Sequence, residues 1–223
     1  MYPDLTCDDI FRIETKRLWL RWPRASDAPA ITSFASLAEV ARCTAAIPHP
    51  YPPGEAERFI LKARAENAAG AALILAITHK AGARHTIGII SAIPAAARGI
   101  ELGYILAPAL WRKGLTSEAV KALIDTVFRV TMTNCIFANS RVQNIASRRV
   151  LEKTGFAFVD AGLDFLPARG GMHPCDRFRL DRRTWAANRI ASGESRGMPP
   201  MTQQVHDENS DRELAPAGQQ SDV

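Results

Sequence analysis

Apolar and polar residues alternate along the chain with two periods. Short apolar or alternating runs bounded by turn residues predict strands at 11–21, 72–78, 86–93, 100–107, 135–139, 156–160 and 177–181. Apolar residues spaced three and four apart predict helices at 28–37, 55–69, 115–130 and 144–154. This order of elements, with three consecutive strands and then a strand–helix–strand unit, predicts an α/β (mixed α+β) fold. It has a central mixed sheet with helices on both faces.

The segments between and beyond these elements divide the chain. Four prolines in 43–54 predict a loop of restricted conformation, and glycines predict another loop at 162–175. Residues 1–9 are predicted to be a flexible lead-in, and 10–187 a single domain. Residues 188–223 are polar and have almost no large apolar side chains, which predicts a disordered tail.

Composition narrows the class of protein. Hydrophobic residues make up 47% and charged residues 23% of the 223 residues, as in soluble globular proteins. No apolar run approaches the roughly 20 residues of a membrane span, and the acidic N-terminus lacks the pattern of a secretory signal. The four cysteines are scattered without a CxxC pair, which favours reduced thiols over a disulfide framework or a zinc site. We therefore expect a cytoplasmic protein without a metal or a membrane contact.

Charge is unevenly distributed. The whole chain has a net charge of +5, and residues 189–223 carry −3. The first 188 residues therefore carry +8. A basic body suits a polyanionic ligand, either a nucleotide cofactor or a nucleic acid. Aromatic residues make up only 7% of the chain and are not interleaved with basic residues. A nucleic-acid partner is therefore disfavoured, because single strands bind on stacked aromatic side chains.

The stretch Ile100–Val130 carries the strongest indication of function. A predicted strand ends at Pro108, a basic turn follows at Trp111–Gly114, and an amphipathic helix begins after it. The first N–H groups of a helix have no intrahelical partner, and the helix dipole adds partial positive charge beside them. This stretch therefore predicts a binding site for a phosphorylated ligand.

Three segments resemble the GNAT acyl-CoA N-acyltransferase superfamily, in particular its RimJ/RimL-like branch. They are ETKRLWLRWPRASDAPAI (14–31), ELGYILAPALWRKGLTSEAV (101–120) and NIASRRVLEKTGF (144–156). The similarity covers residues 12–182. It implies a mostly antiparallel sheet that splays between its fourth and fifth strands, here 100–107 and 133–139, where acyl-CoA enters.

The resemblance also implies an activity and a set of binding residues. The activity is transfer of an acetyl group from acetyl-CoA to a primary amine, on a protein N-terminus or a small molecule, directly within a ternary complex. The implied acetyl-CoA contacts are Leu106, Arg112, Lys113, Gly114, Leu115, Thr116, Ser117, Asn139, Asn144 and Arg149. The pyrophosphate would rest on the backbone amides of Arg112 through Thr116. An exposed strand edge near the C-terminus is compatible with a homodimer.

The catalytic candidates each have a second interpretation. Glu101, at the start of a strand beside the implied opening, is either the general base or a salt-bridged surface acid. Ser147 either protonates the leaving thiolate or satisfies backbone groups at a helix start. The resemblance gives it the former role because Leu151 occupies the usual tyrosine position. His49, Tyr51 and Tyr104 are candidates for substrate binding. His49 is either a base near the acceptor or a solvent-exposed loop histidine. Tyr104 is either a catalytic acid or a packed aromatic ring on the sheet.

One further departure from the family pattern concerns the phosphate site. Arg112 stands where the family has a glycine after the tryptophan, which requires either a strained turn or a looser contact with the phosphates. The arginine offers a cation with several donors in exchange. The alternative function that follows is a non-catalytic sensor module that binds acyl-CoA.

Overall fold

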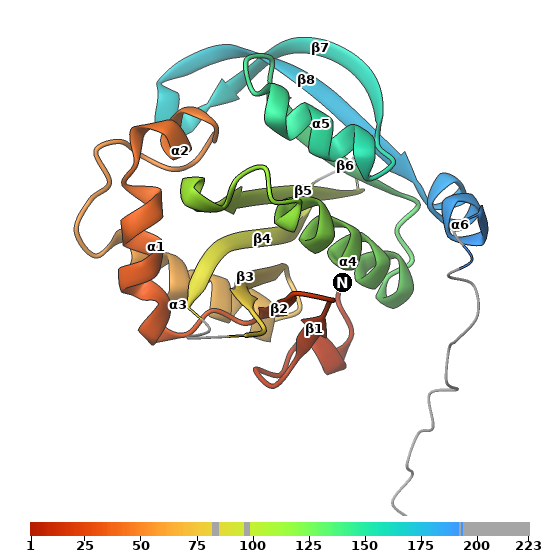
Figure 1. Cartoon of the computed structure of the whole chain (residues 1–223), viewed down its shortest axis with the longest axis horizontal. Coiled ribbons are helices and arrows are strands. Elements are labelled where there is room, and N and C mark those ends of the chain that lie inside the picture. Colours follow the sequence, from red (N-terminus) through yellow and green to blue (C-terminus); the bar gives the residue numbers. More distant parts are fainter. Residues whose placement is uncertain (82–84, 96–98, 192, 194–223) are drawn as a thin grey trace, which may run out of the picture.

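In the computed structural model, which describes residues 1–81, 85–95, 99–191 and 193, one eight-stranded sheet runs through the protein. Its strand order is β1-β2-β3-β4-β5-β6-β8-β7 (Figure 1). The strands are β1 (Arg12–Glu14), β2 (Leu18–Arg21), β3 (Leu73–His79), β4 (Thr86–Ala95), β5 (Gly99–Leu106), β6 (Cys135–Arg141), β7 (Ala157–Leu166) and β8 (Gly171–Asp181). All neighbouring strands are antiparallel except β5 and β6. The predicted mixed, mostly antiparallel sheet is confirmed.

Helices cover both faces of this sheet, as predicted. The helices are α1 (Ala28–Ala35), α2 (Ala38–Arg42), α3 (Glu55–Ala68), α4 (Leu115–Val130), α5 (Ile145–Lys153) and α6 (Arg182–Ala191). α1 and α3 pack on the face of β3 and β4 opposite to α4, and α5 packs against β6 and β7. None of the helices in the described part of the chain combines the length and the hydropathy that crossing a membrane requires.

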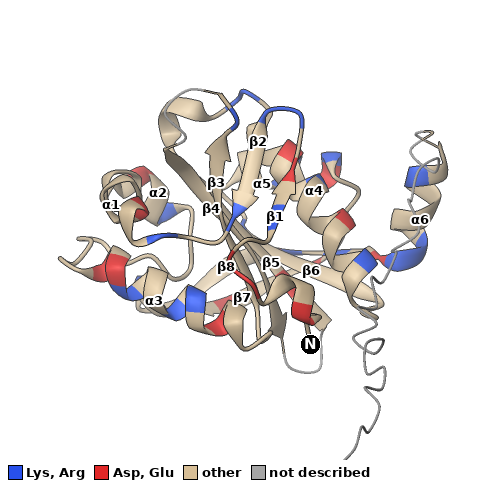
Figure 2. Ribbon diagram, turned by 90° about the horizontal axis from the view of Figure 1, so that it is seen from below, with Lys and Arg blue, Asp and Glu red and all other residues tan. Residues whose placement is uncertain are grey.

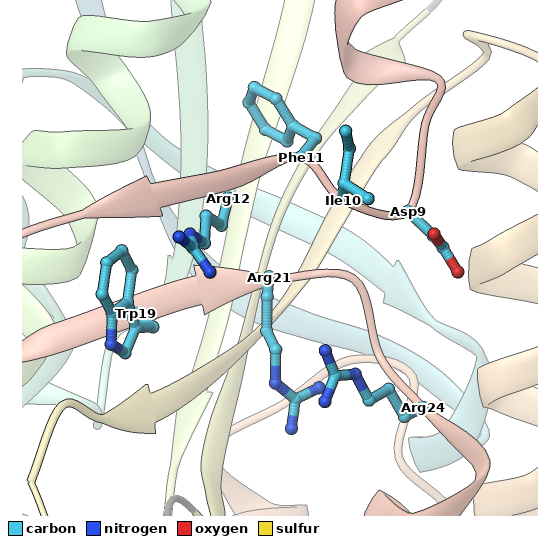
Figure 3. Close-up of a pocket in the computed structure, with 7 residues that line it drawn as sticks. All are labelled: Asp9, Ile10, Phe11, Arg12, Trp19, Arg21 and Arg24. Carbon is cyan, nitrogen blue, oxygen red and sulfur yellow. The ribbon is translucent and has the colours of Figure 1, made fainter.

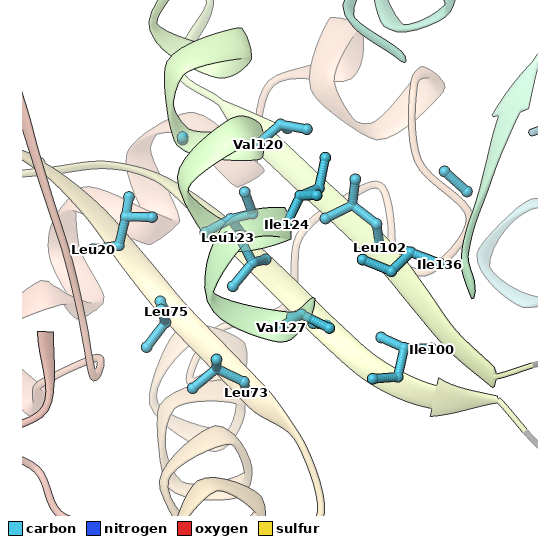
Figure 4. Packing of buried hydrophobic residues seen from close by; sticks show 14 of the residues in the cluster. Leu20, Leu73, Leu75, Ile100, Leu102, Val120, Leu123, Ile124, Val127 and Ile136 are labelled. Atoms are coloured by element: carbon cyan, nitrogen blue, oxygen red, sulfur yellow. The ribbon is translucent and has the colours of Figure 1, made fainter. Parts of the chain in front are cut away.

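The main core lies between α4 and the sheet. Val120, Leu123, Ile124 and Val127, the apolar face predicted for this helix, are all buried there. They pack on alternate strand residues that point to the same side, such as Leu75 (Figure 4). Each such side chain contributes roughly 1.5–3 kcal/mol when it is fully buried. The start of α4 is therefore held at a fixed place above β5.

A second core lies on the opposite face. Ile31 and Phe34 of α1 and Ile60 of α3 pack there against Ile74 and Ile89. The fully buried side chain of Asn67 joins α3 to β3, because it both donates to the carbonyl and accepts from the N–H of Ile74, each at 2.8 Å. In β5, Ile100, Leu102 and Leu106 belong to the first core and Ile105 to the second. Alternate residues of this strand therefore face opposite sides of the sheet.

The sheet parts between β5 and β6. These parallel strands pair only at Ile100↔Ile136 and Glu101↔Phe137. From Leu102 and Ala138 onward they diverge, and Figure 1 shows β7, β8 and α5 grouped apart from β3–β5. The splay implied between the fourth and fifth strands is present. It lies between β5 and β6 because the single strand predicted at 11–21 is in fact two.

The segment 11–21, predicted as one strand, is a hairpin of β1 and β2, and the residues between Glu14 and Leu18 form its turn. The N–H of Thr15 donates to the carbonyl of Leu18 at 3.0 Å, so β1 pairs with β2. The predicted loop at 162–175 was also wrong. β7 extends to Leu166 and β8 begins at Gly171, with a short turn between them. Pro174 is tolerated because it precedes Cys175, the first residue of β8 that pairs with β6.

Both ends of the described chain pack more closely than their composition suggested. Within the expected lead-in 1–9, Tyr2 is buried and its hydroxyl donates to the carbonyl of Ala92 at 2.8 Å. α6 extends to Ala191, past the expected start of the tail at 188. Arg182 ties this end to α4 by donating to the carbonyls of Phe128, Thr131 and Thr133. Residue 192 and residues 194–223, most of the predicted tail, lie outside the described residues.

Candidate active site

The turn between β5 and α4 has two left-handed residues. A 3₁₀ turn at Pro108–Leu110 leads to Trp111, after which Arg112 has φ 63° and Gly114 has φ 72°. Glycine adopts this conformation without a steric cost, whereas arginine does not. Arg112 is the one non-glycine residue with positive φ among the described residues. The missing glycine of the family pattern is therefore accommodated by a strained turn.

This turn presents a row of backbone donors. Within the described chain, none of the N–H groups from Arg112 through Ser117 donates to a protein acceptor; the first that does is that of Glu118, to the carbonyl of Gly114 at 3.2 Å. Gly114, Arg112 and Lys113 are exposed, so these groups face solvent. Unpaired N–H groups at the positive end of a 16-residue helix bind anions.

Side chains from elsewhere hold the turn in shape. The indole N–H of Trp111 donates to the carbonyl of Leu106 at 2.8 Å, and Arg17 donates to the carbonyl of Lys113 at 3.0 Å. Arg17 also pairs with Glu118 at 2.6 Å, and Glu118 accepts from Thr15 at 2.6 Å. Partial burial would raise the pKa of Glu118, but these hydrogen bonds outweigh it and lower that pKa. The carboxylate therefore stays charged.

Thr15, Arg17 and Glu118 were not among the predicted site residues. All three lie inside the family-like segments at 14–31 and 101–120, so the motif itself was the available signal. Nothing in the sequence showed that the two segments touch, because 101 residues separate Arg17 from Glu118. Their contact places the β1–β2 turn against the anion-binding turn.

Replacing Arg112 should separate the strain of this turn from its charge. Arg112→Ala removes the guanidinium and keeps a Cβ at positive φ, whereas Arg112→Gly removes both. We expect Arg112→Gly to have an unfolding free energy about 1 kcal/mol above that of Arg112→Ala. That difference corresponds to a melting temperature roughly 2–4 °C higher. Equal melting temperatures in a calorimetric scan would show that the turn relaxes without cost.

The opening between β5 and β6 has different chemistry on its two faces. Glu101 shares a face with Ile105, which packs on the α1–α3 core, and its side chain is exposed there. Tyr104 shares the other face with Leu102 and Leu106, toward α4 and α5. Glu101 is the last residue of β5 that pairs with β6, and the two strands begin to part after it. It therefore borders the opening, as predicted.

Tyr104 reaches across the opening to α5. Its hydroxyl lies 2.9 Å from the hydroxyl of Ser147 and 3.3 Å from the carbonyl of the same residue. Burial raises the pKa of Tyr104 to about 12, although the hydrogen bond with Ser147 acts against this. Tyr104 thus lies beside Ser147, on the face of the sheet opposite to that of Glu101.

Ser147 is positioned by the helix start. Its N–H donates to the side-chain oxygen of Asn144 at 3.0 Å, so Asn144 caps α5 as predicted. The serine hydroxyl takes no part in this cap and instead meets Tyr104. The backbone of Ser147 therefore completes the cap while its hydroxyl meets Tyr104, and its role toward the leaving thiolate stays a prediction.

The other predicted cofactor contacts fall into two groups. Leu106 and Leu115 are buried beside the turn, and Thr116 and Ser117 lie in the first turn of α4. Asn139 and Arg149 are exposed. Asn139 alternates with Ala138, a member of the α4-side core, so its side chain points to the face of Glu101 and away from Ser147.

Arg148, the neighbour of Arg149, is paired with acids. It pairs with Glu152 at 2.9 Å and with Asp176 at 3.2 Å. Arg149, in contrast, is exposed and takes part in none of the ion pairs of the described residues.

The loop 43–54 closes one end of the opening on the face of Glu101. The carbonyl of Ala45 accepts from Ala168 at 3.1 Å, and that of Ile47 accepts from Arg169, both in the β7–β8 turn. Tyr51 is half-buried against the second core, and burial raises its pKa to about 12. His49 is exposed. No hydrogen bond in the described structure joins His49 or Tyr51 to Tyr104 or Ser147.

A basic hollow lies at the other edge of the sheet, on the β1–β2 hairpin (Figure 3). It is lined by Asp9, Ile10, Phe11, Arg12, Trp19, Arg21 and Arg24. Arg21 is neutralised by a bidentate pair with Asp27 at 2.8 Å, and Arg12 stacks 4.6 Å from the centre of the Trp19 ring. The positive charge of this hollow is thus partly used within the protein.

Acidic and basic residues are also mixed on the helices. On α3, Figure 2 shows positions of both signs, and Glu55–Arg58 and Lys62–Glu66 pair there. The described residues contain no cluster of three or more histidine, cysteine or acidic side chains that could hold a metal ion.

Comparisons with known proteins agree with this geometry. Residues 17–157 match the acetyltransferase (GNAT) domain family. Among solved structures, RimJ of Mycobacterium smegmatis in complex with CoA-disulfide is 19% identical, with a TM-score of 0.69 over 86% of this chain and 98% of its own.

Two further structures come from Vibrio cholerae. A putative ribosomal-protein-serine acetyltransferase is 20% identical, with a TM-score of 0.66 over 81% of this chain and 99% of its own. Spermidine N-acetyltransferase in complex with CoA and spermine is 18% identical, with a TM-score of 0.63 over 76% of this chain and 98% of its own. A search of curated proteins found no significant match. The matched domain spans more than half of the chain, and the chain therefore belongs to the GNAT family of acetyltransferases.

Proposed function

We propose that this protein transfers an acetyl group from acetyl-CoA to a primary amine, directly within a ternary complex. One observation carries the proposal. A carboxylate and a hydroxyl lie on opposite faces of the sheet at the place where its strands part: Glu101 on the α1–α3 face and Ser147 on the α4–α5 face. A donor and an acceptor that enter from opposite faces can meet at such an opening.

The residues of the anion-binding turn fit acetyl-CoA. Its pyrophosphate needs several donors in a small volume, and the N–H groups of Arg112 through Ser117 are unpaired within the described chain and lie at a helix N-terminus. The two strand edges that part beyond Glu101 offer backbone groups to the amide-bearing arm of CoA. When bound, acetyl-CoA supplies a thioester carbonyl that a free amine can attack.

The side chains at the opening suit the proton movements of this reaction. Glu101 would accept the proton that the ammonium must lose, directly or through water. Ser147 would donate a hydrogen bond to the departing sulfur. Positioned acids and bases of this kind each contribute about 10²–10⁴-fold to a rate.

The acceptor is proposed to be the amine of a protein N-terminus or of a small molecule. The solved relatives are named for both kinds, a ribosomal-protein serine in one and spermidine in another. In this chain the acceptor would approach on the face of Glu101, beside His49 and Tyr51 in the loop 43–54. The contacts of that loop with the β7–β8 turn at Ala168 and Arg169 would form one boundary of the acceptor site.

An acceptor screen tests this function. The protein is incubated with acetyl-CoA and a panel of N-terminal peptides and polyamines, and a mass increase of one acetyl group is sought. We expect release of free CoA to match acetylated product. Acetyl-CoA at about 100 times its dissociation constant should also stabilise the fold by roughly 2.7 kcal/mol. The absence of thermal stabilisation at millimolar acetyl-CoA would contradict the proposal.

The second candidate is an acyl-CoA sensor without turnover. Two departures favour it: the strained Arg112 in the anion-binding turn, and Leu151 at the position of the usual tyrosine. A sensor would show thermal stabilisation by acetyl-CoA, but no CoA release above hydrolysis with any acceptor. The Tyr104–Ser147 pair favours the enzyme, because it brings two hydroxyl groups to the opening in place of the missing tyrosine.

A further inference from the structure

The hydroxyls of Tyr104 and Ser147 form a hydrogen-bonded pair in which either oxygen can be the donor. A serine hydroxyl has one hydrogen to donate and two lone pairs to accept with. The oxygens lie 2.9 Å apart, and the tyrosine oxygen is also 3.3 Å from the carbonyl of Ser147, which can only accept. Two arrangements satisfy both contacts: Ser147 donates to the phenol oxygen while Tyr104 donates to the carbonyl, or the Tyr104 O–H is shared between the two oxygens of Ser147. Only the second arrangement leaves the hydrogen of Ser147 unused.

We propose that Tyr104 is a positioning residue for this reaction: it donates to the oxygen of Ser147 and thereby directs the serine O–H toward the sulfur of acetyl-CoA. The inference rests on the proposed function and deepens it at the same site. Without Tyr104, the serine hydroxyl could rotate and donate to neighbouring backbone carbonyls, as serines at helix starts commonly do.

Tyr104 itself is a poor proton source. Burial raises its pKa to about 12, whereas the thiol of cysteine has a pKa of about 8.5. Transfer of its proton to such a thiolate would be unfavourable by more than about a thousandfold. The same burial keeps the phenol protonated, and therefore a hydrogen-bond donor, at every physiological pH. Its role is thus to orient Ser147 and not to act as the acid.

The reaction then balances without a proton from either hydroxyl. The amine nitrogen forms the new bond to the acetyl carbon, and Glu101 takes the proton that nitrogen loses. The carbon–sulfur bond breaks and its electron pair goes to sulfur, which leaves as a thiolate hydrogen-bonded to Ser147. Solvent protonates the thiolate after release.

A double-mutant cycle tests the coupling. We expect Ser147→Ala to lower kcat by roughly 10- to 100-fold and Tyr104→Phe by roughly 5- to 20-fold, with little change in the KM for acetyl-CoA. Adding Tyr104→Phe to Ser147→Ala should change kcat by less than about twofold, because Tyr104 acts through the serine. The control is Tyr2→Phe. It also removes a buried tyrosine hydroxyl, bonded to the carbonyl of Ala92 at 2.8 Å, but this hydroxyl forms no described hydrogen bond with Ser147. Additive losses in the double variant would overturn the proposal.

A binding measurement gives a readout that does not depend on turnover. Titration calorimetry at about pH 9, above the pKa of a cysteine thiol, compares CoA, which can bind as a thiolate, with desulfo-CoA, which lacks the sulfur. We expect the wild-type protein to prefer CoA by roughly 5- to 10-fold, as one charge-assisted hydrogen bond allows. Tyr104→Phe and Ser147→Ala should each lose this preference, and Tyr2→Phe should keep it.

The outcomes separate the inference from the function it rests on. If neither CoA nor desulfo-CoA binds the wild-type protein, the proposed function fails. If both bind equally well while acetyl transfer proceeds, the function stands and the role of Tyr104 is overturned. A preference for CoA that survives Tyr104→Phe but not Ser147→Ala would likewise overturn it.

Discussion

Glu101→Gln is expected to lower kcat by about 10²–10⁴-fold, the contribution that a positioned general base makes to proton transfer. Glutamine has nearly the same shape and can still form hydrogen bonds, but its amide cannot accept a proton at neutral pH. The side chain of Glu101 is exposed at the last position where β5 pairs with β6, so the substitution should leave the core unchanged. The expected loss is therefore chemical and not structural.

Two features should identify a base. In Glu101→Gln, the KM for acetyl-CoA should change little, because the anion-binding turn lies at the other end of β5. The fall of kcat/KM at low pH should also lose the component that protonation of a base causes. Glu66→Gln on α3 is the matched control, since it removes a carboxylate that pairs with Lys62 away from the opening. An unchanged pH profile in Glu101→Gln would remove Glu101 as the base, whatever the size of the rate loss.

Gly114→Val is expected to raise the KM for acetyl-CoA by roughly 10- to 100-fold with a smaller effect on kcat. Gly114 has φ 72° directly before α4, and a β-branched residue is strongly disfavoured there. The chain would leave the left-handed conformation and turn the following N–H groups away from the phosphates. Losing one or two such hydrogen bonds to a charged group costs about 1.5–3 kcal/mol, which corresponds to this range.

Gly54 provides a control with the same backbone. It precedes α3 with φ 74° and ψ 1°, against φ 72° and ψ 7° at Gly114. An added Cβ would meet ordinary contacts at both sites, 3.9 Å from Arg58 and 3.6 Å from Arg17. Gly54→Val should therefore lose similar stability, about 1–2 kcal/mol, without any change in the KM for acetyl-CoA. A comparable rise in KM in both variants would mean that destabilisation, and not the anion-binding turn, is responsible.

Glu101 and the anion-binding turn lie at opposite ends of β5. β5 carries Glu101 where it parts from β6 and leads into the anion-binding turn at its other end. Because β5 pairs with β4 along its whole length and packs against α4, its ends keep a fixed separation. We expect the variants of Glu101 and Gly114 to act almost independently, as distant sites in a rigid element do.

The sequence by itself determined the parts of the fold that depend on local pattern. The apolar spacing of Val120, Leu123, Ile124 and Val127 fixed the buried face of α4, and its bounds agree with the prediction. Proline and glycine marked the turn before it. The three family-like segments gave the superfamily and the splayed sheet, because such motifs combine a local conformation with a local chemistry.

Only the tertiary structure decided which distant residues meet. The contact of Arg17 with Glu118, and that of Tyr104 with Ser147, join segments 101 and 43 residues apart. Strand alternation could assign Glu101 and Tyr104 to opposite faces, but not say which helix covers each face. The length of the β7–β8 hairpin was equally hidden, since strand pairing overrides the local preferences of its glycines and prolines. Periodicity determines which side of an element is buried, whereas long-range packing determines what it is buried against.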